Sequence, residues 1–292
     1  MPRAGPPVDL HRLAERLGRI EALDRPAKLL AELVKAIAPP TSLPKDLLSG
    51  TWLGHPLHPL LTDIPIGSFT SATVLDLIGG PAGERAADRL VHLGLLSSVA
   101  TAAAGAADWS DTDREEQRVG VVHAAANVAG VALYGLSALA RRRGRRRAAT
   151  TYGLAGMAVM TVGGYLGGFL GYGRGVGVNK TFSERPPTAW TPVLDDAELP
   201  TGEPHRVDVG GATVLLYRRG QDILAIGSRC SHAGGPLEEG DVDTEGRTVT
   251  CPWHRSVFDL TTGEVVHGPA SVPQPAYDTR VQGGRVEVRA RV

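Results

Sequence analysis

Cysteine is nearly absent from this chain: there are two among 292 residues, and one motif uses both, which leaves none for a disulfide. Aromatic residues make up only 5% of the chain, and neither sign of charge predominates, because 31 Lys and Arg balance 31 Asp and Glu. A chain without net charge has no general attraction for nucleic acid or other polyanions. We therefore expect neither a disulfide framework nor a nucleic-acid partner.

Long stretches of the chain also lack charge. They are 90–107, 119–140, 148–172 and, apart from Asp63 and Asp76, 57–80. Each is about as long as the ~17–25 residues that a helix needs to cross a bilayer, and their Gly, Ala, Ser and Thr content suits close helix packing in lipid. A soluble bundle would leave a polar face on each helix, and 148–172 has none. We predict that residues 51–172 form an all-α bundle of four transmembrane helices surrounded by membrane lipid.

The first fifty residues do not look like a cleavable signal peptide, because charged residues occur throughout them. Apolar residues recur there at helical spacing in two runs, which are Leu10, Leu13, Leu17 and Ile20, then Leu30, Leu33, Val34 and Ile37. Pro26 separates the runs, and Pro39-Pro40 ends the second. We predict that 1–50 forms two short amphipathic helices, on the membrane surface or against the bundle. A solvent-facing hairpin is the alternative.

Both cysteines lie beside histidines in two short motifs near the C-terminus. Cys230-Ser231-His232 is followed, after eighteen residues, by Cys251-Pro252-Trp253-His254. Two thiolates and two imidazoles suit a 2Fe–2S cluster, with both cysteines on one iron and both histidines on the other. The same four side chains could also bind a tetrahedral zinc ion. The ligand types alone leave both sites open.

The residues around these motifs resemble the Rieske family over about 190–292. The resemblance is carried by the motifs, by SVFDLTTGE at 256–264, by GPA at 268–270 and by alternating residues near the C-terminus. It implies a small all-β domain with one 2Fe–2S cluster. Cys230 and Cys251 would bind the inner iron, and His232 and His254 the exposed one. The residue pattern predicts strands near Val193 and at 205–209, 213–218, 223–226, 248–250, 257–259, 277–281 and 286–289.

Several positions depart from the high-potential branch of that family. Gly235 and Trp253 stand where it has a disulfide, and Phe258 replaces a tyrosine that donates a hydrogen bond to a ligand sulfur, whereas Ser256 keeps its hydroxyl. Fewer hydrogen bonds to sulfur stabilise the reduced cluster less, so we expect a potential of roughly −150 to +50 mV. Arg255 replaces the glycine that usually follows the second histidine. It would be either a cation at a docking surface or a tolerated surface substitution.

The membrane half carries a second resemblance. The segment GTWLGHPLHP at 50–59, followed by DIPIG at 63–67, resembles the opening of a family of uncharacterised four-helix bacterial membrane proteins. The resemblance covers about 52–172 and implies architecture but no activity. Residues 173–189 are rich in Gly and Pro and read as a linker to the C-terminal domain.

Four histidines form a possible second site in the bundle: His55, His58, His92 and His123. Ionisable residues at membrane depth are costly and tend to mark function, and imidazoles on facing helices commonly hold haem or a metal. With helices starting near 82 and 113, His92 and His123 would lie within roughly 8 Å in depth. A bound haem, a quinone or another metal ion is therefore one reading. Interface positions and interhelical hydrogen bonds are the other.

The charges around the helices bear on which side of the membrane the C-terminal domain faces. Six arginines lie within 141–147, and the positive-inside rule keeps such a loop cytoplasmic, which places the C-terminal domain outside. Lys35, Lys45, Arg174, Lys180 and Arg185 on the other side oppose this. The arginines could also act as an internal twin-arginine signal that exports a folded domain, although the residues usual after such a pair are missing.

Three functions fit the sequence. The first is a membrane-anchored electron-transfer protein that passes single electrons between a quinol or haem donor and a partner docking near His232 and His254. The others are a ferredoxin-like component of a reductase or oxygenase system and a membrane redox sensor. We expect no complete catalytic site, because a second iron would need two histidines and a carboxylate, and only His267 follows the motifs. The sequence leaves the oligomeric state open.

Overall fold

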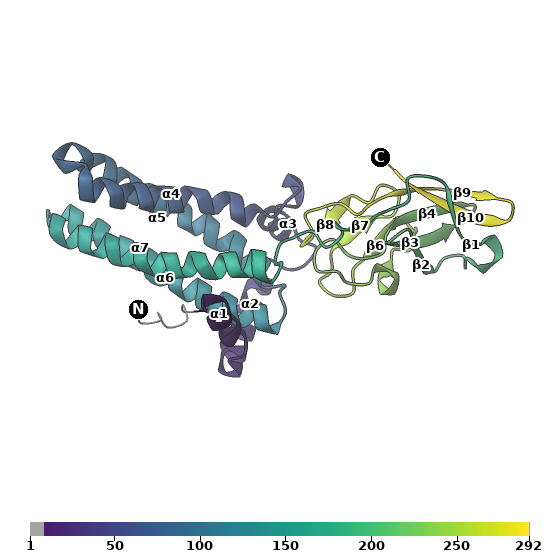
Figure 1. Cartoon of the computed structure of the whole chain (residues 1–292), viewed down its shortest axis with the longest axis horizontal. Helices are drawn as coiled ribbons and strands as arrows, with labels where there is room; N and C mark the ends of the chain where they lie inside the picture. Colours follow the sequence, from purple (N-terminus) through teal and green to yellow (C-terminus); the bar gives the residue numbers. More distant parts are fainter. Residues whose placement is uncertain (1–8, 292) are drawn as a thin grey trace, which may run out of the picture. The chain divides into compact units, whose positions relative to one another are not determined.

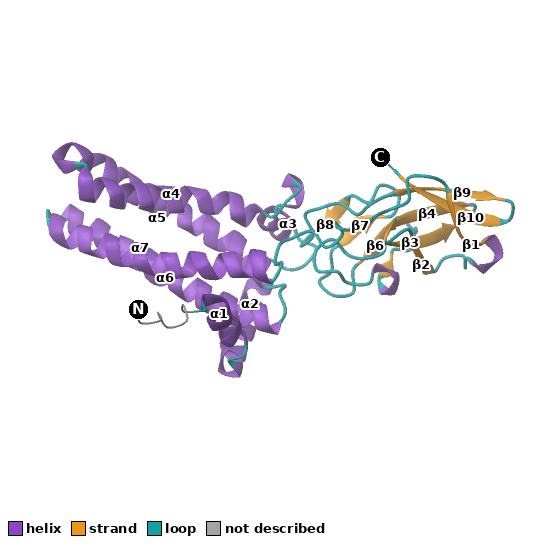
Figure 2. Cartoon of the chain, viewed as in Figure 1, coloured by secondary structure: helices purple, strands orange, loops and turns teal. Residues whose placement is uncertain are grey.

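A computed structural model describes residues 9–291 of the chain. The residues fall into two compact units that interleave along the sequence (Figure 1). The helical unit comprises Met1–Ala36 and Leu57–Val176, and the β unit comprises Ile37–Pro56 and Gly177–Val292. Colouring by secondary structure separates them as a mostly helical part and a mostly strand-and-loop part (Figure 2). A helical membrane region followed by a small antiparallel β domain confirms the predicted fold class.

Four long helices form the body of the helical unit: α4 (Leu57–Ile78), α5 (Gly80–Trp109), α6 (Arg114–Arg142) and α7 (Arg146–Gly168), the last continuing into a π turn (Phe169–Gly173). Small residues let them approach closely. A Cβ placed on Gly156 of α7 would lie 3.1 Å from the carbonyl oxygen of Gly130 on α6. Phe69 and Tyr134 stack within the bundle, with ring centroids 4.0 Å apart. Membrane helices associate in this way: the hydrophobic effect does not drive them together in lipid, so van der Waals contact at close approach stabilises the bundle.

Three of these helices are long and apolar enough to cross a membrane: Gly80–Trp109, Arg114–Arg142 and Arg146–Gly173. They support a membrane location for the chain. The fourth, α4, is 22 residues long but falls outside this set. Its apolar run is diluted by Asp63, Pro65 and Asp76.

The N-terminal helices are α1 (Leu10–Gly18) and α2 (Asp24–Ile37), close to the predicted pair, although Pro26 lies in the first turn of α2 and not between the helices. α1 packs against the bundle, where Ala14 joins Val119, Leu166 and Phe169 in one buried cluster. Arg118 of α6 fixes the connection by donating to the Asp24 carboxylate at 2.6 and 2.8 Å and to the Gly18 carbonyl at 2.9 Å. Leu29, Leu33 and Ile37 of α2 stay exposed.

The arginine-rich segment is mostly helix and only in part a loop. α6 continues to Arg142 and α7 begins at Arg146. The Arg141 guanidinium is buried between the carboxylates of Asp76 and Asp88, and Arg146 pairs with Asp88 and Glu84. Asp76, one of the two aspartates in the otherwise uncharged stretch 57–80, thus belongs to this ion-pair cluster. The arginines that remain exposed are Arg142, Arg143, Arg145 and Arg147.

The β unit contains three small antiparallel sheets. The first has the order β1 (Thr191–Asp195), β10 (Arg285–Ala290), β9 (Tyr277–Gln282), and the second has β2 (Pro204–Val209), β3 (Ala212–Arg219), β4 (Asp222–Gly227). The third has β5 (Asp241–Val242), β6 (Thr248–Thr250), β7 (Val257–Asp259) and β8 (Val265–His267). The eight predicted strands are all present. β5 and β8 were not predicted.

Two segments outside the predicted β domain belong to the β unit. Residues 177–189, which were predicted to be a linker, contact it directly: the Lys180 amide donates to the Ser231 carbonyl at 2.9 Å, and Thr181 is buried. Residues 37–56 contain a further helix, α3 (Leu43–Ser49), and a turn at Thr51–Leu53. Residues 37–56 and 177–189 are thus grouped with the C-terminal domain in one compact unit.

Candidate metal centre

The first ligand loop follows β4 and carries Cys230 and His232. Two backbone hydrogen bonds of 2.8 Å close it, from Cys230 to the Gly235 carbonyl and from Gly234 to the Cys230 carbonyl. Gly234 has a positive φ of 85°, the left-handed conformation that glycine adopts without strain. The short loop thereby presents the sulfur and the imidazole from residues two apart.

The second ligand loop follows β6 and carries Cys251 and His254. It closes in the same way, with Cys251 donating to the Ser256 carbonyl at 2.8 Å and Arg255 donating to the Cys251 carbonyl at 3.1 Å. Arg255 has a φ of 67°, so this position does need the left-handed conformation expected of glycine. Its half-exposed side chain pairs with Asp241 at 3.2 Å.

The four ligand side chains come together as two like pairs. Both cysteines are 1% exposed. The two histidine rings lie edge to face, 5.1 Å between centroids, and the Nδ1 atoms of both are buried. A hydrogen bond from the Cys230 thiol, helped by the backbone amides of Trp253 and His254, lowers the pKa of the Cys251 thiol. That hydrogen bond, together with burial, raises the pKa of Cys230.

This arrangement fits two irons better than one ion. A tetrahedral zinc would draw all four side chains to a single point. Two separate pairs are what a 2Fe–2S cluster requires, with sulfur on one iron and nitrogen on the other. The backbone amides that face the two sulfurs are also suited to tune such a cluster.

Three of the positions compared with the high-potential branch, Gly235, Ser256 and Phe258, line the interior of the site. A Cβ on Gly235 would lie 2.9 Å from the Cys251 sulfur, so only glycine fits there. The Phe258 ring is fully buried in the core cluster that contains Cys230 and Cys251. Ser256 is also fully buried, and its hydroxyl accepts from the Ala270 amide at 2.9 Å. These contacts place Phe258 and Ser256 beside the ligands.

A third loop, at 268–272, covers the same region. Ala270 is 1% exposed and belongs to the core cluster of the two cysteines. The Ser231 hydroxyl, between the first two ligands, donates to the Val272 carbonyl at 2.6 Å. The outer rim is different, because Pro252, Trp253, Arg229 and Arg255 are exposed. The site is thus sealed on its sulfur side and open near its histidines.

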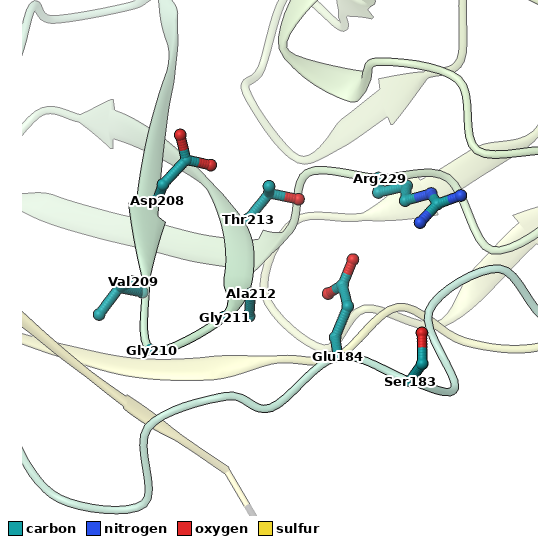
Figure 3. Close-up of a pocket in the computed structure, with 9 residues that line it drawn as sticks. All are labelled: Ser183, Glu184, Asp208, Val209, Gly210, Gly211, Ala212, Thr213 and Arg229. Carbon is teal, nitrogen blue, oxygen red and sulfur yellow. The ribbon is translucent and has the colours of Figure 1, made fainter.

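A separate cavity of about 430 Å³ adjoins the first ligand loop at Arg229. Figure 3 shows Glu184 extending into it toward Thr213 and Arg229. Burial raises the pKa of the Glu184 carboxyl, and the nearby Arg229 opposes that shift. None of the four ligands lines this cavity, so it is not part of the metal centre.

Comparison with known proteins agrees with this geometry. Residues 189–278 match the Rieske [2Fe-2S] domain family. The chain is 36% identical over 90 residues to the 3-phenylpropionate/cinnamic acid dioxygenase ferredoxin subunit of Escherichia coli (strain K12), covering 31% of this chain and 83% of the relative. This chain belongs to the Rieske family. The Rieske domain supports one 2Fe–2S cluster and an electron-transfer role.

Other comparisons extend the match. The subunit of the same name from Shigella boydii serotype 4 (strain Sb227) is 34% identical over 90 residues, with the same coverage of 31% and 83%. A solved structure, the ferredoxin of carbazole 1,9a-dioxygenase from Nocardioides aromaticivorans IC177, is 33% identical with a TM-score of 0.34. It covers 35% of this chain and 99% of that one. Residues 54–180 match the family described as predicted membrane protein (DUF2231).

The four bundle histidines do not form one group. His55 belongs to the β unit, where it hydrogen-bonds the neighbouring Pro56 carbonyl at 2.9 Å. His92 Nε2 lies 3.4 Å from the Arg142 guanidinium. Arg142 is nineteen residues beyond His123 on α6, which is a rise of about 28 Å. No arginine side chain spans that length, so the expected closeness of His92 and His123 is wrong: the helices are offset along their axes.

His58 of α4 and His123 of α6 each reach the backbone of a neighbouring helix. His58 Nδ1 lies 2.9 Å from the Thr101 carbonyl, and His123 Nδ1 lies 2.8 Å from the Gly163 carbonyl. A carbonyl can only accept, so each Nδ1 carries the proton and each Nε2 keeps its lone pair. Both rings are therefore oriented as neutral acceptors or ligands.

Proposed function

We propose that this chain is a membrane-anchored electron carrier, which passes single electrons between a donor in the membrane and a redox partner protein docking at His232 and His254. The observation that carries the proposal is the asymmetry of the metal centre. Its cysteines are 1% exposed, whereas its histidines reach a rim of exposed residues. A bound 2Fe–2S cluster supplies one-electron chemistry, and the imidazole side is where electrons would enter and leave.

The rim has the composition of a docking surface. Trp253 is 54% exposed beside His254, and Arg255 and Arg229 add positive charge. Exposed aromatic and arginine side chains are enriched at interfaces, and charge at a rim steers encounter. We therefore expect a partner with an acidic rim around an apolar patch. The exposed leucines of α2 fit contact with the lipid surface.

For the donor we favour a quinol or a haem held in the helical unit at His58 and His123. Each of these neutral imidazoles offers Nε2, which could bind iron or accept a hydrogen bond from a quinol hydroxyl. His92 and His55 take no part in this site. Asn127 adds a second polar group, because its side chain lies 3.3 Å from His123 Nε2.

An electron-transfer assay of the full chain in lipid vesicles tests this proposal. Optical and EPR spectra, oxidised and reduced, report the cluster and any haem together. We expect quinol to reduce the cluster in the unaltered chain, and His58→Ala or His123→Ala to slow that reaction at least tenfold. Dithionite should still reduce the cluster in both variants.

His92→Ala is the matched control, because it removes a histidine of the same bundle at the arginine-rich end. It should keep the unaltered rate. If His58→Ala and His123→Ala also keep that rate, these rings only pack the bundle, and the donor is a separate protein.

We further propose that the β unit faces the extracytoplasmic side. The exposed arginines Arg142, Arg143, Arg145 and Arg147 at the α6–α7 turn would remain in the cytoplasm under the positive-inside rule. Single cysteines at Arg143, in the α6–α7 turn, and at the exposed Glu245, in the β unit, would report on which side of the membrane each position lies. A membrane-impermeant maleimide applied to intact spheroplasts should label Glu245→Cys and spare Arg143→Cys. The opposite pattern reverses the orientation.

The second candidate is a ferredoxin-like component of a reductase or oxygenase system. It is favoured by the relatives, which are named as dioxygenase ferredoxin subunits. A soluble flavin reductase with NADH would then reduce the cluster faster than quinol does. Comparing the two reductants on one preparation separates the candidates.

A further inference from the structure

Part of the β unit comes from sequence that precedes the membrane helices. α3 begins after Ser42, whose hydroxyl accepts from the Lys45 amide at 3.4 Å, and ends at Gly50, which has a φ of 75°. Both Lys45 and Ser49 are buried, so this short helix packs firmly. Its sequence lies more than 120 residues before the region that matches the Rieske family, residues 189–278.

This segment, residues 42–53, which we call the latch, grips the third loop of the metal centre. The Asp46 carboxylate accepts from the Gly268 amide at 2.8 Å and from His267 Nδ1 at 2.9 Å. The Thr51 hydroxyl donates to the Ala270 carbonyl at 3.2 Å. A Cβ on Gly268 would lie 2.7 Å from the Thr51 oxygen, so the glycine is what allows this approach.

The third loop links the latch to the second ligand loop through the backbone of Ala270. The Ala270 carbonyl accepts from the latch, and the Ala270 amide donates to Ser256, two residues after His254. The Ala270 side chain is buried among Cys230 and Cys251. One residue therefore connects the latch, the second ligand loop and the core around both sulfurs.

We propose that Asp46 is a positioning residue for the cluster: through Gly268 and His267 it holds the third loop closed over the sulfur side of the metal centre. The segment just before the first long helix thereby controls how often water reaches the cluster. Charge-assisted hydrogen bonds are about twice as strong as neutral ones, so Asp46 contributes more than Thr51. The inference rests on the cluster of the proposed function but not on the identity of the donor or partner.

Hydrogen exchange and cluster lifetime in the full chain test this role. In Asp46→Ala, we expect amides at 267–271 to exchange about tenfold faster or more, and a chelator to bleach the cluster faster by a similar factor. Asp46→Asn keeps an acceptor for Gly268 and gains a donor for His267, so both rates should stay within about threefold of the unaltered chain. The reduction potential should rise in both variants, because a negative charge leaves the site.

Two further variants keep the outcome decisive. Asp208→Ala is the matched control, since it removes an equally charged but exposed carboxylate of the β unit and should change neither rate. Thr51→Val removes only the hydroxyl and should speed exchange at 267–271 severalfold, even if Asp46→Ala does not fold. Unaltered exchange and bleaching in Asp46→Ala, or unaltered exchange in Thr51→Val, would overturn the proposal. A chain that binds no cluster would refute the electron-transfer function and still leave the exchange rates to test the latch.

Discussion

The two units of this chain treat their buried polar groups in opposite ways. In the helical unit, such groups pair with each other or with the backbone: Arg141 with Asp76, and His58 and His123 with carbonyl oxygens. In the β unit, two thiols and two imidazoles are collected into one place, and the loops around them bury the two thiols. Pairing of the first kind stabilises a fold, whereas collection of the second kind serves a bound group.

This contrast explains why one site could be assigned with more detail than the other. The two cysteines are free thiols that lie buried in one cluster beside two histidines, which favours metal binding as their role. The bundle histidines already have protein partners, so their role depends on what their Nε2 atoms meet. The four predictions below test whether the units are as different as this comparison implies.

Replacing a ligand cysteine should abolish the cluster in the β unit and leave the helical unit folded. In Cys251→Ser we expect total loss of the cluster's visible and EPR signals, because the inner iron loses one of its two thiolates. The helical unit has its own core and should still insert and fold. Circular dichroism and membrane extraction would check this, with Ser228→Ala, just before the first ligand loop, as a control. Loss of membrane insertion in Cys251→Ser would show that the units fold as one.

Breaking the buried ion-pair cluster should mainly harm the helical unit. Asp76→Ala leaves the 2% exposed Arg141 side chain with less compensation, which costs about 3–5 kcal/mol for a buried pair. Thermal unfolding followed by helical circular dichroism should move to markedly lower temperature. Glu84→Ala, at the half-exposed edge of the same cluster, should cost less than about 1 kcal/mol. Equal losses would mean that burial does not set the value of these pairs.

A hydroxyl added next to the sulfurs should change the cluster and not the helices. Phe258→Tyr should raise the reduction potential, because a phenol can donate to a ligand sulfur where a phenyl cannot. Protein-film voltammetry of the full chain measures this. Phe182→Tyr, whose ring is 73% exposed, is the control and should leave the potential unchanged. An unchanged or lower potential in Phe258→Tyr would mean that the ring edge does not reach a sulfur.

The smallest expected effect is at Arg255. Its φ of 67° costs an ordinary residue about 1–2 kcal/mol, which glycine avoids, although glycine also adds freedom to the unfolded chain. Arg255→Gly should therefore stabilise the β unit by about 0.5–1 kcal/mol, and the loss of positive charge near Cys251 should lower the potential slightly. A melt of the cluster absorbance gives the first value, and voltammetry gives the second. A lower melting temperature would show that the Asp241 pair outweighs the strain.

The sequence predicted the features that local patterns encode. The charge-free stretches predicted the long helices, and alternation predicted most strands. β5 and β8, of two and three residues, were missed. Residue type and spacing, together with the resemblance to the Rieske family, predicted the four candidate ligands. Arg255 was noticed because a glycine was missing, and its positive φ explains why glycine is usual there.

What the sequence missed depends on contacts between distant residues. α3 has seven residues and no apolar repeat, and the bonds from its Asp46 span 221 and 222 positions. The separation of His92 from His123 depends on how far the helices slide past each other, which no single helix encodes. From sequence alone, Arg141 and Arg146 were read as part of a charged loop. Their acidic partners lie on α4 and α5, far away in sequence, so these ion pairs could not be foreseen.

The position of the latch also constrains how many times the chain can cross a membrane. Asp46 and Gly268 touch, so residues 37–56 and 177–292 occupy the same aqueous compartment. A chain that returns to its starting side has crossed an even number of times. With three crossings by α5, α6 and α7 alone, the latch would lie on the opposite side of the bilayer from the third loop, which it contacts. If α5, α6 and α7 each cross, parity requires α4 to cross as well, and Arg141 would then accompany its Asp76 as a paired charge.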